Sequence, residues 1–273
     1  MLLGVLYAGY SATRLLADDS LTMARERAVA TESVERALGL DLEAPLNQLF
    51  LSSETLRLVG SYWYATLHYV VTAAVLLWLY RRGRASSYLP ARRALVLASV
   101  AALACYLMMP LAPPRFMPGY VDVLHLTATD GWWGADASAP RGLGEYTNEL
   151  AAFPSLHAGW ALWVALVVGR ETSARWARSL AWVYAAGTAL VVIGTGNHWT
   201  LDVVGGWAVV LAAWLLVGNL PERPDPGPSG PATHRPGSER RQPPVANRAS
   251  ACLTTAGSDV DHIGGSEARR KDP

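Results

Sequence analysis

The chain has 273 residues, of which 51% are hydrophobic and 16% are charged, and its formal net charge is +1. This nearly neutral, apolar composition lacks the basic surface of a nucleic-acid-binding protein, so we expect no nucleic-acid partner. The apolar residues gather in segments of roughly 20 residues, the helix length that crosses the hydrocarbon core of a bilayer. The sequence therefore predicts an all-α, polytopic membrane protein, a helix bundle with about six transmembrane helices.

Four regions follow one another along the chain. Residues 1–16 are apolar but short, and we interpret them as a first transmembrane helix, with the core of a signal peptide as the alternative. Residues 17–60 are more polar, and residues 61–220 hold the other apolar segments, which we expect to form the transmembrane catalytic core. Residues 221–273 are rich in Pro, Gly, Ser and Arg, a composition typical of a disordered tail.

Residues 17–60 carry charges of both signs at helical spacing. The charged positions are Arg25, Glu26, Arg27, Glu32, Glu35 and Arg36. Val29, Val34 and Leu38 fall roughly on the other face of the same helical pattern. This pattern predicts one or two amphipathic helices at the membrane surface, and an ordinary solvated linker helix is the alternative.

Arginine supplies nearly all the positive charge, since Lys271 is the one lysine. Two connections between predicted spans are rich in arginine. They hold Arg81, Arg82, Arg84, Arg92 and Arg93 in the first, and Arg170, Arg175 and Arg178 in the second. The positive-inside rule makes both connections cytoplasmic, which places residues 112–153 on the outer face. We therefore expect a multi-pass protein of the cell membrane with its active site outside and its C-terminal tail in the cytoplasm.

The stretch Phe153-Pro154-Ser155-Leu156-His157-Ala158-Gly159-Trp160 is the polar opening of an apolar helix. Proline suits the first turn of a helix, so Ser155 and His157 are expected there. The free amide groups and the positive end of the helix dipole stabilise an anion such as phosphate at this position. A histidine in that turn can donate a proton to the bound anion or attack it.

A second polar stretch, Gly194-Thr195-Gly196-Asn197-His198-Trp199-Thr200-Leu201-Asp202, opens the last apolar helix. His198 and Asp202 are four residues apart, so they are expected on one helical face. There the carboxylate can fix the tautomer of the imidazole and stabilise its charged form.

Three further residues are candidates for the same site. His68 lies inside an apolar span, where an ionisable side chain is either functional or hydrogen-bonded to a neighbouring helix. Arg115 and Arg141 lie in the long outer loop, and each guanidinium could bind a phosphate through two hydrogen bonds. Contact with lipid headgroups is the alternative for both arginines.

Together, FPSLHAGW and GNHWTLD resemble the second and third signature motifs of the type 2 phosphatidic acid phosphatase superfamily, and the likeness covers about residues 62–220. The wording Phe-Pro-Ser-Leu-His-Ala-Gly looks most like the branch of the inositol phosphorylceramide synthases. The resemblance implies that His198 is a nucleophile that forms a phosphohistidine, oriented by Asp202. It also implies that His157 protonates the leaving alcohol.

The same resemblance implies that Ser155 and Arg115 bind the phosphate oxygens. Arg141 and Asn197 are further candidates for phosphate binding, and we expect no metal or other cofactor, because positioned cations, helix dipoles and two histidines suffice for the chemistry. The chain departs from the family pattern at several positions. Met108 stands where the first motif has its lysine, Phe116 follows Arg115 where the family has proline, and Val191 and Val192 replace a Ser-Arg pair.

Several functions stay open on the sequence alone. Water as the acceptor of the phosphoryl group gives a lipid phosphatase, whereas an alcohol gives a phosphotransferase that moves a headgroup between lipids. Membrane lipids are the expected partners in both cases, and the sequence does not indicate an oligomeric state. From other classes, a b-type haem electron carrier and a non-catalytic membrane protein are the alternatives.

Overall fold

The computed structural model describes residues 21–133 and 148–218. Residues 1–16, the tail 221–273 and Arg141 lie outside the described residues, so the predictions made for them stay predictions. Within the described ranges the regular structure is helical and contains no strand, and Leu111 and Ala151 form an isolated β-bridge. The predicted all-α helix bundle is confirmed.

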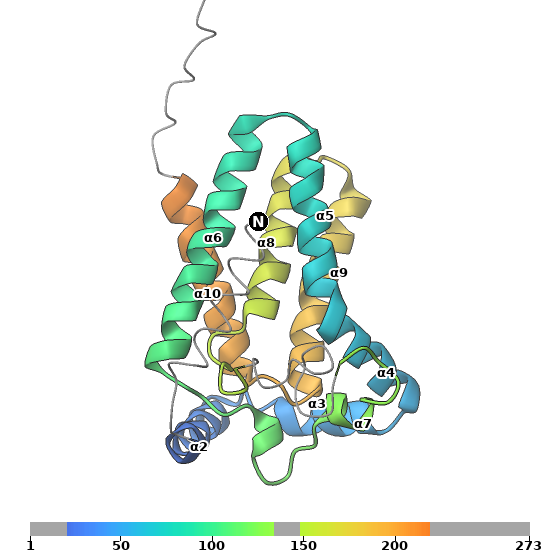
Figure 1. The fold of residues 1–273 in the computed structure, drawn as a ribbon, viewed down its shortest axis with the longest axis vertical. Coiled ribbons are helices and arrows are strands. Elements are labelled where there is room, and N and C mark those ends of the chain that lie inside the picture. Colours follow the sequence, from blue (N-terminus) through green and yellow to red (C-terminus); the bar gives the residue numbers. More distant parts are fainter. Residues whose placement is uncertain (1–20, 134–147, 219–273) are drawn as a thin grey trace, which may run out of the picture. The chain divides into compact units, whose positions relative to one another are not determined.

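Long apolar helices form the bundle (Figure 1). In chain order they are α4 (Glu54–Tyr62), the π-helical segment η1 (Trp63–Leu67) and α5 (His68–Arg81), which run on as one rod, then α6 (Ala85–Met108), α8 (Leu156–Glu171), α9 (Arg175–Gly194) and α10 (Thr200–Gly218). Four stretches in the described part of the chain are long and apolar enough to cross a membrane: Glu54–Arg81, Ala85–Met108, Arg175–Gly194 and Thr200–Gly218. The protein is therefore a membrane protein, with four such spans where the sequence analysis expected about six.

Helix α8 is the central helix of the bundle. It packs against α5, α6, α9 and α10, and most of its residues are buried. Its 16 residues span about 24 Å at 1.5 Å per residue, less than the hydrocarbon core of a typical bilayer. Trp160 and Trp163 fill the surrounding core, and their indole N–H groups donate to Ser99 Oγ and to the carbonyl of Ala91 on α6. The helix thus depends on its neighbours and not on lipid for its environment.

Two boundaries differ from the sequence-based expectation. The span predicted from Ala94 begins nine residues earlier, so Arg92 and Arg93 lie inside α6 and not in a loop. The guanidinium of Arg92 lies 5.5 Å from the ring centre of Tyr88. A long side chain can keep its charge near the membrane interface while its stem covers apolar surface, so arginine is tolerated inside this helix. The rod that contains His68 likewise begins at Glu54, within the region expected to be surface helices.

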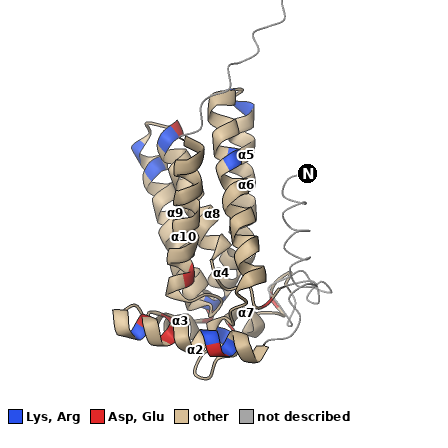
Figure 2. Cartoon of the chain, turned by 90° about the vertical axis from the view of Figure 1, so that its left-hand side faces the viewer, with Lys and Arg blue, Asp and Glu red and all other residues tan. Residues whose placement is uncertain are grey.

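Shorter helices lie across one end of the bundle (Figure 1). They are α2 (Leu21–Leu38), α3 (Glu43–Leu51), the 3₁₀ turn η2 (Pro114–Phe116) and α7 (Val123–Leu126). Both arginine-rich connections lie at the opposite end (Figure 2), where Arg82 donates to the carbonyl of Glu171 at 2.8 Å. The two ends of the bundle therefore differ in structure and in charge.

The two faces of helix α2 differ in burial. Val29, Val34 and Leu38 are about half exposed, and their position at the membrane surface stays a prediction. Glu35, however, was expected on the solvated face and is fully buried. Its carboxyl group accepts a hydrogen bond from the backbone of α10, which offsets part of the cost of burying this polar group.

Candidate active site

The π-helical segment η1 presents aromatic residues to the bundle interior. The ring of Tyr64 stacks on His157 with 4.2 Å between the ring centroids and an interplanar angle of 21°. His68, the first residue after the π segment, is buried, and its ring centroid lies 3.9 Å from that of His157. A π segment inside an α-helical rod is frequent at functional sites because it changes which residues face inward. His68 is therefore a direct neighbour of the predicted general acid.

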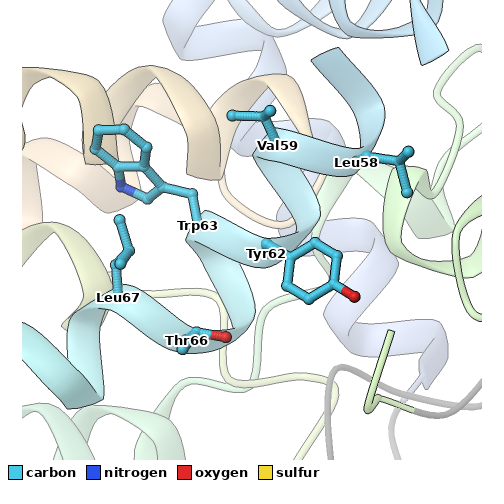
Figure 3. A pocket seen from close by; sticks show the side chains of 6 residues that line it. All are labelled: Leu58, Val59, Tyr62, Trp63, Thr66 and Leu67. Carbon is cyan, nitrogen blue, oxygen red and sulfur yellow. The ribbon is translucent and has the colours of Figure 1, made fainter. Parts of the chain in front are cut away.

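An apolar pocket lies along the end of α4 and the π segment (Figure 3). Its lining consists of Leu58, Val59, Tyr62, Trp63, Thr66 and Leu67. None of the candidate histidines contributes to it, so the pocket is separate from the polar site.

The start of α8 is capped by a neutral side chain. Ser155 is the N-cap and not a first-turn residue, and its hydroxyl accepts from the amide of Ala158 at 3.3 Å. His157 is the second helical residue. Among the described residues, no acceptor bonds the amide groups of Leu156 and His157. This helix end has free donors for an anion, and phosphate binding there stays a prediction.

His198 lies in the turn between α9 and α10 and not on the helical face expected for it. Gly196 allows this turn, because its φ of +77° suits glycine and few other residues. The ring of His198 is 4% exposed, and Nδ1 lies 2.9 Å from the carbonyl oxygen of Ala152. A carbonyl can only accept, so Nδ1 carries the proton and Nε2 has a free lone pair in the neutral ring.

The pKa of His198 is lowered to about 3, chiefly by burial; the bond to Ala152 acts in the opposite direction, and the positive charge of Arg115 contributes to the lowering. The imidazole is therefore neutral at physiological pH. A neutral imidazole with a free Nε2 is the form that can act as a nucleophile.

Asp202 lies in the first turn of α10, with one oxygen 3.5 Å from His198 Nδ1. The same oxygen accepts from the amide of Trp199 at 2.7 Å. The nearest partner of Nδ1 is thus the carbonyl oxygen of Ala152, and not Asp202, which the sequence analysis expected to fix the tautomer. Asp202 stays close enough to stabilise a positive charge on the ring.

The two predicted catalytic histidines lie together although 41 positions separate them in sequence. Their ring centroids are 5.7 Å apart. The two helix starts also contact each other directly, since the amide of Ser155 donates to the carbonyl of Asp202 at 2.8 Å. Gly206 makes this approach possible, because a Cβ there would lie 2.2 Å from the carbonyl oxygen of Ser155.

Arg115 is held beside the His198 turn. Its Nη1 donates to Asn197 Oδ1 at 2.5 Å, its Nε lies 3.4 Å from Asp122, and its amide donates to the carbonyl of Gly196. The amide nitrogen of Asn197 donates in turn to Thr195 Oγ1 at 3.0 Å. Arg115 and Asn197 are therefore part of the same site, but Asn197 orients the guanidinium and already uses both ends of its amide.

Two buried acids are residues that the sequence analysis did not assign to the site. Glu43 Oε1 accepts from the amide and the hydroxyl of Thr200, both at 2.6 Å. Glu35 Oε1 accepts from the amide of Leu201 at 2.6 Å. Nothing in the local pattern distinguishes these acids from the exposed ones beside them. Tyr64 was missed for the same reason, since it is one of several aromatic residues at the start of an apolar span.

No group of three or more His, Cys, Asp or Glu side chains that could hold a metal ion occurs in residues 21–133 and 148–218. The polar groups that converge here are two imidazoles, a guanidinium, a hydroxyl and free amides. This set can neutralise and position a phosphoryl group, attack it and protonate a leaving oxygen.

A family model described as the PAP2 superfamily matches residues 31–216, which include every site residue described above. The chain belongs to the PAP2 superfamily. Membership of this family, the type 2 phosphatidic acid phosphatases, indicates a phosphatase-type lipid phosphoesterase in a membrane. No curated protein and no solved structure matches the chain.

Proposed function

We propose that this PAP2-superfamily protein is an integral-membrane lipid phosphoesterase that works through a phosphohistidine on His198. The observation that carries the proposal is the pair of imidazoles 5.7 Å apart, one of them with Nδ1 directed to the carbonyl of Ala152 and Nε2 free. A nucleophile and a proton donor on either side of one phosphoryl group are what phosphoryl transfer through a covalent intermediate needs.

In the first step, the lone pair of His198 Nε2 attacks phosphorus and forms the N–P bond while the bond from phosphorus to the leaving oxygen breaks. His157, protonated when a phosphate anion is bound beside it, gives its proton to that oxygen, and the alcohol leaves. Asp202 stabilises the positive charge that His198 gains. The amides of Leu156 and His157, with Arg115 and the hydroxyl of Ser155, neutralise the phosphate oxygens.

In the second step, an acceptor oxygen attacks the phosphohistidine. His157, now neutral, takes the proton of the acceptor as the N–P bond breaks, which restores both histidines. Water as acceptor gives hydrolysis, whereas the hydroxyl group of a second lipid gives transfer. The likeness of Phe153-Pro154-Ser155-Leu156-His157-Ala158-Gly159 to the inositol phosphorylceramide synthases favours transfer as the second candidate.

The test uses the full chain in detergent-lipid micelles. We expect wild type to release phosphate from phosphatidic acid, and His198→Ala to lose at least about 1,000-fold in kcat. Quenching with detergent at alkaline pH and ³²P-labelled substrate should trap a phosphoenzyme in wild type and not in His198→Ala, and later exposure to acid should release its label. An acid-stable phosphoenzyme, or an active His198→Ala, would contradict the nucleophile assigned here.

The proposed roles of the two histidines can be distinguished with substrates that differ in their leaving group. A phosphoester of a nitrophenol needs little protonation on departure, so His157→Ala should lose far less activity on it than on phosphatidic acid. His198→Ala should lose activity equally on both substrates. If His157→Ala lost as much activity on the nitrophenol ester as on phosphatidic acid, His157 would not be the general acid.

Hydrolysis and transfer differ in their products. Labelled phosphatidylinositol with and without an acceptor lipid that carries a free hydroxyl group, such as a ceramide, should yield a new phospholipid in the transfer case alone. On the topology, we propose that the site faces the outside, because the arginine-rich connections lie at the other end of the bundle (Figure 2). A membrane-impermeant lipid phosphate added to sealed cells should then be consumed.

A further inference from the structure

Side-chain carboxyl groups accept hydrogen bonds from the backbone amides at the start of α10. Three consecutive amides, those of Trp199, Thr200 and Leu201, donate to three different acids at 2.7, 2.6 and 2.6 Å. The first acceptor, Asp202, belongs to α10 itself. The other two, Glu43 and Glu35, come from segments more than 150 residues earlier in the chain.

Glu35 and Glu43 are both fully buried, and their carboxyl groups lie close enough to interact with each other. Burial of carboxylates in this way is costly, and a single serine or threonine would cap a helix without that cost. The two acids therefore do more than satisfy amides. They fix α2 and α3 against α10 at the residues that directly follow His198.

Helix α3 also holds the other side of the His198 turn. Asn47 Nδ2 donates to the carbonyl of Gly194 at the end of α9, and to the carbonyl of Val121, each at 3.0 Å. The turn that carries His198 is thus held at its entry by Asn47 and at its exit by Glu43. One helix bridges the two ends of the loop that presents the nucleophile.

We propose that Glu35 and Glu43 are positioning residues for His198, and that α2 and α3 form a clamp that keeps its Nε2 directed at the phosphoryl group. This inference rests on the proposed function for its kinetic consequences. Neither acid touches the reacting atoms. Their effect passes through the backbone of residues 199–201, so loss of the clamp lowers the rate of the chemical step more than it lowers substrate binding.

The kinetic test compares alanine with glutamine. Glu43→Ala removes the acceptor for Thr200, and we expect kcat to fall roughly tenfold or more with KM changed less than about twofold, by analogy with the loss of a helix cap. Glu43→Gln keeps an acceptor oxygen at the same place and should retain activity within about threefold. The same pattern is expected for Glu35→Ala and Glu35→Gln. Glu26→Ala, at an exposed position on α2, is the matched control and should behave as wild type.

A second measurement needs no substrate. Hydrogen exchange followed by mass spectrometry should show amides of the peptide around residues 199–204 exchanging about tenfold faster in Glu43→Ala and Glu35→Ala. The peptide at the far end of α10 should exchange as in wild type. If an alanine variant does not fold, Glu43→Asp takes its place, because its shorter side chain keeps the charge and loses the reach.

Unchanged exchange at residues 199–204 together with unchanged kcat would overturn the clamp. So would a loss that appears in KM and not in kcat, or a glutamine variant as impaired as the alanine variant. A wild type that processes no lipid phosphate rejects the proposed function instead, and the exchange measurement then still decides whether the two acids hold the helix start.

Discussion

The two helix starts that meet at the site are built in opposite ways. Helix α8 begins with a neutral cap, Ser155, and leaves the amides of Leu156 and His157 without an acceptor among the described residues. Helix α10 begins with its amides bonded to three side-chain carboxyl groups. An anion from outside can therefore bind at the first helix, whereas the second is already occupied by acids of the protein itself.

The starts of α8 and α10 therefore have different roles. The sequence predicts an anion at the helix start that carries Ser155 and His157, and at α8 the amides of Leu156 and His157 have no acceptor among the described residues. At α10 the dipole is used to fix a backbone, and the residue that benefits is His198, two positions before the helix.

The largest loss of activity is expected when an acid is placed at the start of α8, as acids already stand at the start of α10. Ser155→Asp supplies a good N-cap, so the helix should remain, but its charge lies where the phosphate is proposed to bind. Two like charges about 4 Å apart at an effective dielectric constant near 20 repel by about 4 kcal/mol, so we expect kcat/KM to fall roughly 100- to 1,000-fold. Phosphate release from phosphatidic acid measures this fall.

Ser155→Ala is the matched control, since it removes the cap without adding a charge. It should lower the unfolding midpoint by more than Ser155→Asp does, and lower kcat/KM by much less. If Ser155→Asp kept wild-type activity while folded, phosphate binding at the α8 start would be wrong.

A smaller loss is expected at the cation between the two helix starts. Arg115→Lys keeps the charge but cannot donate to Asn197 and a phosphate oxygen through one planar group, so we expect kcat/KM to fall about 10- to 100-fold. Addition of guanidinium at millimolar concentration should restore part of the activity of Arg115→Ala. Arg57→Lys, at a guanidinium that bonds the carbonyl of Leu51 away from the histidines, is the control.

A neutral substitution can push the starts of α8 and α10 apart. Gly206→Ala places a Cβ 2.2 Å from the carbonyl of Ser155, so either α8 or α10 must shift. We expect about 1–3 kcal/mol of destabilisation and a roughly tenfold loss of kcat, because the distance between His157 and His198 changes. Gly169→Ala in the same bundle meets nothing within 4 Å and should leave both unchanged. Equal behaviour of the two variants would show that the junction is not tight.

Much of this arrangement was predictable from sequence, for reasons that are local. His157 and Ser155 follow a proline at the head of an apolar segment, and a helix start exposes its residues by construction. His198 was placed near the right position, but its separation from the helix depends on Gly196 and on the carbonyl of Ala152, which no spacing rule contains.

Glu35 could not be predicted, because its burial depends on a contact with Leu201, 166 positions away. Amphipathic periodicity separates the faces of α2 correctly by polarity. It does not say which polar residue will find a buried donor. The inward turn of Tyr64 likewise depends on the π segment, and a π-helical turn leaves no clear mark in the apolar pattern.

The smallest effect concerns the acids at α10 alone. Burial raises the pKa of Glu35 from 4.5 to about 8, and the charges of Glu43 and Asp202 act in the same direction against the bond from Leu201. Between these values the folded protein holds a proton that the unfolded chain releases. The stabilising contribution is therefore complete below pH 4.5 and is lost as the pH rises through 8.

The thermal unfolding midpoint of wild type in detergent should accordingly decrease as the pH is raised from 5 to 9. Glu35→Gln cannot ionise and still accepts from the amide of Leu201, so its midpoint should change less over the same range. The difference between the two should be on the order of a few kcal/mol at most. Glu26→Gln on the exposed face of α2 should follow the wild-type slope. Parallel profiles for wild type and Glu35→Gln would mean that Glu35 is ionised throughout, and α10 would then begin among permanent negative charges, in still sharper contrast to the neutral start of α8.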